Sequence, residues 1–180
     1  MSQTVRPVSD PFDLGDMPES RPMCTVDELL VRAPVGRVFG LAREVEHWPR
    51  HLPHYRWVRF HDRARDGGGT VEMAAWRPFG PARWPTWWTS QMSVSERAPA
   101  VRFRHVQGIT AGMDVEWSFE RQGDATRVRI VHMWDGPGWP IIGELAARSV
   151  IGPVFVHGIA QRTLAGLAAV AERGAGLSRG

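Results

Sequence analysis

The stretch VRAPVGRVFGLAREVEHWPRHLPHY, residues 31–55, sets the order of the first elements. A strand ends at its start, and Pro34 then opens a helix, because the fixed φ angle of proline suits the first helical turn. The apolar residues Val35, Val38, Phe39 and Ala42 recur at helical spacing. Pro49 and Pro53 interrupt the short helical segment that follows. Tyr55 then starts the first long strand.

The rest of the chain shows two patterns of apolar residues, one typical of strands and one typical of a helix. The pattern alternates with period two from Tyr55 to Asp135, which is typical of strands with one buried face. Together with a strand at 25–33, it predicts strands at 55–64, 70–77, 84–96, 101–109, 112–121 and 125–134. An alanine-rich helix is expected from Ile141 to Arg173, kinked at Pro153. We therefore predict an α+β fold, in which a curved antiparallel sheet of about seven strands wraps around a long C-terminal helix.

The length of 180 residues suits one domain. We assign this domain to residues 23–175, with a flexible N-terminal arm at 1–22 and a tail at 176–180. The polar, proline-rich start does not resemble a signal peptide, and the apolar runs are too short to span a membrane. A single cysteine excludes an intrachain disulfide. We expect a cytoplasmic protein without stable membrane insertion.

Charged residues form a pattern on the solvent face of the sheet. The basic residues number 22, all of them arginine, and their dispersal argues against nucleic-acid binding. Parity places acidic residues of 113–120 between arginines of 101–107 and 126–134, where opposite charges stabilise the register. A turn at 123–124 pairs Glu120 with Arg127, and Val115 with His132.

The opposite, inner face combines large rings with a few polar groups. It carries Trp88, Ser90, Met92, Phe103, His105, Gln107, Trp117, His132 and Trp134. Leu145, Phe155, Ile159 and Leu167 are expected on the inner side of the helix. Buried polar groups need partners, so they either bond within a closed core or orient a ligand in an apolar pocket. Nine tryptophans, several on one face, favour a pocket.

Three histidines of the opening stretch have a spacing that can bind zinc on a helix. His47, His51 and His54 lie at i, i+4 and i+7. Two prolines interrupt that helix, however, so we expect solvated histidines and no metal.

The stretch at 31–55 resembles the start of the polyketide cyclase and START-like (SRPBCC) family. In that family a strand ends in Ala-Pro, a helix follows, and a Glu-x-Trp-Pro segment leads into the next strand. The matching residues here are Ala33-Pro34, Val38-Phe39 and Glu46-His47-Trp48-Pro49. The resemblance covers about residues 24–173 and implies the helix-grip fold, with a hydrophobic cavity between sheet and helix.

Within the family, the chain looks most like the aromatase/cyclases of bacterial aromatic polyketide synthesis. Trp48 and Tyr55 match residues that the resemblance places in the pocket, and Ser90 matches a serine two positions after a strand tryptophan, here Trp88. The cyclases also carry an arginine just beyond that serine, where this chain has Met92 and Ser93. Arg162 on the long helix is the best substitute.

Two functions remain open. The first is a cofactor-independent polyketide cyclase or aromatase, with Tyr55, His105 and His132 as candidate acids or bases. The second is a non-catalytic carrier of a lipid or a quinone resembling coenzyme Q. The partner is a hydrophobic or aromatic small molecule in both, and an acyl carrier protein is a candidate partner of the first. The expected ligand-binding residues are Trp48, Tyr55, Trp57, Met73, Trp88, Ser90, Met92, Phe103, Gln107, Trp117, Trp134, Phe155, Ile159 and Arg162. The ligand and the oligomeric state do not follow from the sequence.

Overall fold

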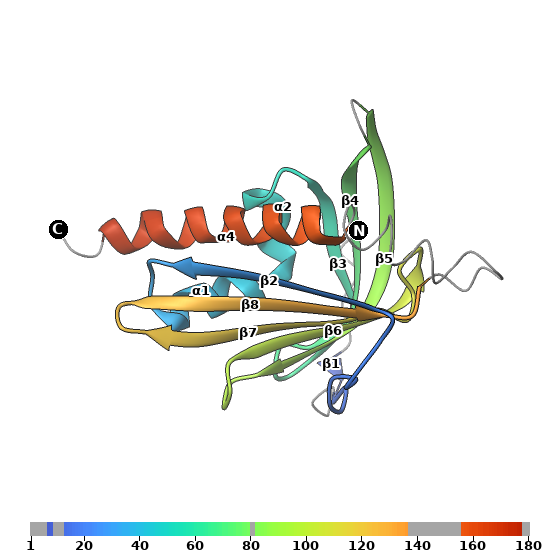
Figure 1. Ribbon diagram of the computed structural model, residues 1–180, viewed down its shortest axis with the longest axis horizontal. Helices are drawn as coiled ribbons and strands as arrows, with labels where there is room; N and C mark the ends of the chain where they lie inside the picture. Colours follow the sequence, from blue (N-terminus) through green and yellow to red (C-terminus); the bar gives the residue numbers. More distant parts are fainter. Residues whose placement is uncertain (1–6, 9–12, 80–81, 137–155, 178–180) are drawn as a thin grey trace.

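A single curved sheet forms most of the molecule (Figure 1). The computed structural model describes residues 7–8, 13–79, 82–136 and 156–177. The strands follow the order β1-β3-β4-β5-β6-β7-β8-β2, and all neighbours are antiparallel except β1, which runs parallel to β3. Their bounds are β1 Pro7–Val8, β2 Met23–Val31, β3 Tyr55–Ala64, β4 Gly69–Phe79, β5 Ala82–Ser95, β6 Ala100–Gly108, β7 Asp114–Gln122 and β8 Ala125–Trp134.

The helices lie on the inner side of this sheet (Figure 1). They are α1 Val35–Arg43, the 3-10 turn η1 Val45–His47, α2 Trp48–His51 and α4 His157–Leu177. Helix α1 buries Val38, Phe39 and Ala42, as their spacing predicts. Pro34 takes an extended conformation immediately before its first turn. Among the described residues, no helix is both long and apolar enough to cross a membrane.

The predicted α+β helix-grip fold is confirmed. Seven strands form the antiparallel part of the sheet, and α4 is the C-terminal helix. Ile159 and Leu167 are buried, as expected for its inner side. Leu145, Phe155 and the kink expected at Pro153 lie outside the described residues.

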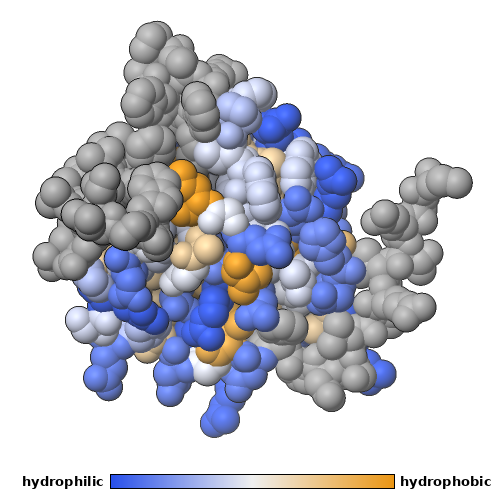
Figure 2. Space-filling view, turned by 90° about the vertical axis from the view of Figure 1, so that its right-hand side faces the viewer, coloured by the Kyte–Doolittle hydropathy of each residue, from blue (hydrophilic) through white to orange (hydrophobic). Residues whose placement is uncertain are grey.

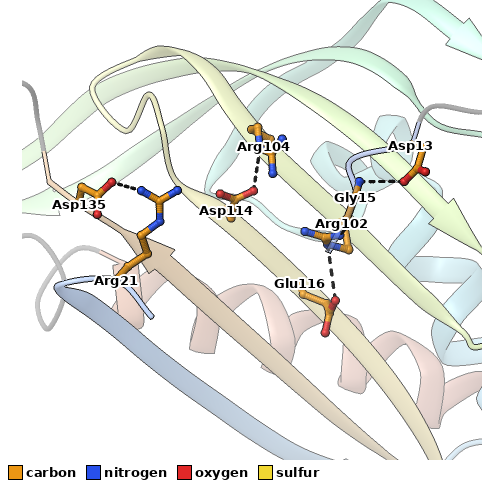
Figure 3. Close-up of polar contacts among 8 residues, drawn as sticks. All are labelled: Asp13, Gly15, Arg21, Arg102, Arg104, Asp114, Glu116 and Asp135. Carbon is orange, nitrogen blue, oxygen red and sulfur yellow. Dashed lines mark hydrogen bonds and ion pairs between the residues drawn. The ribbon is translucent and has the colours of Figure 1, made fainter. Parts of the chain in front are cut away.

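Charge pairs fix the register on the outer face, as the alternation predicts. Glu120 lies opposite Arg127, and Val115 lies opposite His132. Arg104 Nε donates to Asp114 Oδ1 at 2.8 Å, between β6 and β7 (Figure 3). This contact involves a buried carboxylate, whereas Glu120 and Arg127 are exposed and 3.9 Å apart.

Described parts of the N-terminal segment, for which the sequence predicts a flexible arm, contact the sheet. Residues 7–8 pair with the end of β3, and Leu14 is buried. The Arg102 guanidinium donates to the Gly15 carbonyl, and Arg21 forms an ion pair with Asp135 just beyond β8. Figure 3 shows these residues beside the arginine–carboxylate pairs of β6 and β7. The alternation does not reveal these contacts, because β1 has only two residues and residues 13–22 lie outside the strands.

The exposed surface is mostly hydrophilic. Figure 2 shows a few hydrophobic residues among hydrophilic ones on one face of the molecule. The exposed large apolar residues among those described are Val26, Leu29, Leu30, Trp87, Val106 and Ile109. The other aromatic side chains described are mostly turned toward the concave face, where the functional groups are found.

Candidate functional site

A cavity lies between the inner face of the sheet and the start of α4. Its volume is about 60 Å³, which is room for a few water molecules. Its walls come from α2, β3 to β8 and the residues at 156–163. The lining residues are Trp48, Tyr55, Met73, Trp88, Phe103, His105, Thr110, Met113, Val115, Trp117, His132, Val156, Ile159, Ala160 and Thr163.

Trp48 is the centre of the aromatic wall. The prolines of the opening stretch confine α2 to one turn, and its first residue, Trp48, is 2% exposed. The indole Nε1 donates to the Leu41 carbonyl at 3.0 Å, which fixes the ring. Its ring centroid lies 5.2 Å from that of Tyr55 and 5.7 Å from that of Trp117. Such tilted pairs stabilise each other beyond their buried area, so α2 is held rigidly against the sheet.

The aromatic wall continues across the sheet to a histidine. The centroids of Tyr55 and Trp88 are 6.2 Å apart, and those of Trp88 and His105 are 5.9 Å apart. The planes of Trp88 and His105 meet at only 25°, so the two rings stack. This stacking orients the imidazole at the edge of an apolar surface.

The polar groups around the cavity occur as histidine–threonine pairs. His105 Nδ1 lies 2.7 Å from Thr110 Oγ1, and both side chains are buried. His132 Nδ1 lies 3.4 Å from the Thr25 hydroxyl on β2. A threonine hydroxyl both donates and accepts, so it can match either tautomer of its histidine. Thr110 is therefore a close, uncharged partner of His105, and Thr25 is a more distant one of His132.

Most predicted site residues meet at this cavity. The three candidate acids or bases, Tyr55, His105 and His132, all line it. The lining also includes the predicted ligand-binding residues Trp48, Met73, Trp88, Phe103, Trp117 and Ile159. The sequence thus predicts a set of side chains that the fold brings together from eight separate elements.

Three other predicted residues are buried next to the cavity without lining it. Trp134 is 1% exposed, and its indole donates to the Ala111 carbonyl at 2.9 Å. Met92 and Ser90 are fully buried on the inner face of β5. Among the described residues, no hydrogen-bond partner of the Ser90 hydroxyl is found.

Three predicted residues lie outside the cavity lining, for separate reasons. Trp57 stacks under the Arg59 guanidinium at 4.2 Å, and its strand neighbour Val58 takes the inward position. Gln107 is exposed because β6 has a bulge at Val106. This extra residue lies between the pairs Thr89–Gln107 and Ser90–His105, so the inward and outward positions change places after it. Arg162 is exposed, next to Thr163 on α4 but not in the lining. Phe155 lies outside the described residues.

The sequence reasoning missed several cavity residues. Thr110 belongs to the turn between β6 and β7, where alternation says nothing about direction. Thr163 lies on α4 at i+4 from Ile159, so helical spacing could have found it. His54 does not line the cavity, but the sequence predicts it in solvent, whereas its Nε2 lies 3.0 Å from Thr163 Oγ1.

The other two histidines of the opening stretch do face solvent. His47 and His51 are exposed, and His47 Nδ1 lies 3.2 Å from Glu44. Within the described part of the chain, no group of three or more histidine, cysteine or carboxylate side chains could hold a metal ion. The three histidines therefore do not act together.

Comparison with known proteins identifies a matching family and several similar structures. Residues 31–152 match the family model described as polyketide cyclase / dehydrase and lipid transport. A segment of 109 residues is 32% identical to the actinorhodin polyketide synthase bifunctional cyclase/dehydratase of Streptomyces coelicolor. That match covers 59% of this chain and only 33% of the bifunctional protein.

Solved structures with the same fold are more distant in sequence. The Zhui aromatase/cyclase of Streptomyces sp. R1128 superposes with a TM-score of 0.69 at 17% identity, over 84% of this chain and 94% of that one. A START superfamily protein of Mycobacterium smegmatis gives a TM-score of 0.64 at 15% identity, over 83% and 97%. At these identities, the likeness concerns the fold.

Proposed function

Because this chain belongs to the polyketide cyclase / dehydrase and lipid transport family, we propose that its cavity binds a poly-β-ketone chain and promotes its cyclisation to an aromatic ring. One observation carries the proposal. Tyr55, His105 and His132 line the same cavity, and the rest of its lining is mostly apolar and includes four aromatic rings. These are groups that can move protons, next to surfaces that can hold a folded unsaturated chain.

The reaction needs little from the protein. A methylene between two carbonyls loses a proton, the resulting enolate attacks a third carbonyl further along the chain, and the alkoxide formed takes up a proton. Water then leaves to give the unsaturated ring. Holding the chain bent brings the reacting carbons together, which alone removes much of the barrier.

The histidines are suited to the proton transfers. Thr110 holds the His105 imidazole at Nδ1, and we assign this ring the role of the base that removes the methylene proton. His132 lies opposite Val115 of β7, so β7 separates it from His105 on β6. It is the second histidine that can transfer a proton to the reacting chain. The Tyr55 hydroxyl is the candidate donor to the alkoxide.

The size of the cavity limits how the ligand enters. Sites for drug-sized ligands span about 300 to 1,000 Å³, far more than the 60 Å³ enclosed here. A polyketide therefore requires the walls to move apart. Met73 and Met113 in the lining are flexible side chains that adapt to different shapes.

A second candidate function is non-catalytic transport of a lipid or quinone. One observation favours it: none of the described lining residues is an arginine, so no fixed positive charge stabilises an enolate. An apolar cavity with a few orienting polar groups would be sufficient for a carrier.

Reconstitution distinguishes the two functions. The purified protein is added to a minimal polyketide synthase that releases unreduced chains, and the products are separated by liquid chromatography and mass spectrometry. A cyclase shifts the product mixture toward one aromatic regioisomer, and the His105→Asn variant loses this shift. An unchanged mixture, together with transfer of a quinone between lipid vesicles, would support the carrier instead.

A further inference from the structure

The part of the cavity wall that comes from the start of α4 is apolar except at one position. It consists of Val156, Ile159, Ala160 and Thr163, whose spacing places them on one helical face. Thr163 is only 1% exposed to outside solvent. A valine would have nearly the same shape there, so the hydroxyl needs an explanation beyond packing.

His54 holds this hydroxyl from outside the cavity. Its Nε2 lies 3.0 Å from Thr163 Oγ1, and its ring centroid is 4.8 Å from that of Tyr55. In the described part of the chain, His54 is the one hydrogen-bond partner of the Thr163 hydroxyl. A hydroxyl donates one hydrogen bond and accepts two. One contact therefore leaves capacity for a ligand.

We propose that Thr163, oriented by His54, is a ligand-binding residue that recognises a hydroxyl or carbonyl oxygen of the aromatic ligand. The inference rests on the proposed function, because it requires an aromatic ligand in the cavity. His105 and His132 approach the cavity from the sheet, whereas Thr163 approaches from the helix. A ligand with oxygens on both edges is then held in one orientation. This orientation determines which two carbons of the chain form the new bond.

A purely structural role for the same hydrogen bond makes a different prediction. His54 and Thr163 also attach the segment before β3 to α4, as does Leu52, whose side chain lies against Gly166. Loss of an attachment lowers stability but cannot distinguish between ligands of equal shape. Discrimination between two such ligands is therefore the decisive readout.

The test uses 2-naphthol and 2-methylnaphthalene, which have the same shape and differ in one hydroxyl group. Quenching of tryptophan fluorescence gives both affinities. Wild type should prefer 2-naphthol. Thr163→Val should weaken 2-naphthol binding at least tenfold, which is about 1.4 kcal/mol, and change 2-methylnaphthalene binding less than twofold. Thr163→Ser, which restores a hydroxyl, should recover the preference.

Thr126→Val is the matched control. Thr126 is a fully buried threonine outside the cavity lining, and its hydroxyl donates to the Ala33 carbonyl at 2.7 Å. The variant should lower the melting temperature and leave both affinities unchanged. If Thr163→Val weakens both probes equally, or neither, the role of Thr163 in recognition is overturned while the proposed function stands. If wild type binds neither probe, the proposed function fails, and the role of Thr163 fails with it.

Discussion

His105 Nδ1 lies 2.7 Å from Thr110 Oγ1, across the turn that joins β6 to β7. Gly108 starts this turn at φ +95°, and a Cβ atom there would lie 2.5 Å from the Trp87 carbonyl oxygen. Only glycine fits that backbone, so the turn geometry presents Thr110 to the histidine. The orientation of the candidate base therefore depends on a turn outside the regular sheet.

Two substitutions of His105 should have different consequences. His105→Phe leaves the Thr110 hydroxyl without its partner, and we expect the free energy of unfolding to fall by about 1 to 3 kcal/mol. His105→Asn keeps a polar atom near the Nδ1 position and removes Nε2. It should retain more stability yet lose the cyclising activity. Urea unfolding and product analysis on both variants test this, and an active His105→Asn would exclude His105 as the base.

Trp48 should be essential to the inner wall. Trp48→Ala removes a ring that contacts Tyr55, Phe103 and Trp117, so we expect a loss of about 3 to 5 kcal/mol. Trp48→Phe should cost less, because it keeps a ring and loses mainly the hydrogen bond to Leu41. Chemical denaturation measures both, and equal losses for the two variants would mean that the hydrogen bond, not the packing, holds α2.

The charge pairs of the outer face should differ in strength. Arg104→Met leaves the buried carboxylate of Asp114 without its charged donor. We expect a loss of about 1.5 to 3 kcal/mol. Arg127→Met is the matched control, because its pair with Glu120 is exposed and such pairs contribute about 0 to 1 kcal/mol. Equal effects in thermal unfolding would contradict this ranking.

The N-terminal segment should stabilise the domain. Deletion of residues 1–22 exposes the site of Leu14 and removes the contacts of Arg21 and Gly15. Burial of one leucine is worth about 2 kcal/mol, which corresponds to roughly 4 to 8 °C in melting temperature. Deletion of residues 1–6 serves as the control and should have little effect. Identical melting temperatures for both deletions would show that the contacts of 13–22 are energetically negligible.

The regular parts of the fold were readable from the sequence because each strand buries one face. The outward charges and inward apolar residues of β7 and β8 agree on one register, and that register is the one observed. Proline positions likewise mark the start of two helices, because Pro34 precedes α1 and Pro49 lies in the first turn of α2. Such signals are local, so a single sequence contains them.

The errors occur where the pattern is interrupted or the partner is distant. The extra residue Val106 reverses the direction of Gln107, and nothing in the alternation marks it. His54 lies 109 positions from Thr163, so its inward contact depends on how α4 packs. Ligand-facing groups on turns and on distant elements require the three-dimensional structure.

The central claim is that the ligand binds between the sheet and α4, and the indole N–H signals of a ¹H–¹⁵N spectrum test it most directly. Trp48, Trp88 and Trp117 line the cavity, whereas Trp87 is half exposed and Trp57 lies under Arg59. On titration with 2-naphthol, the account predicts saturable shifts of the three inner indoles and unchanged signals of Trp57 and Trp87. Shifts confined to the outer tryptophans, or no shift of the inner three, would contradict it.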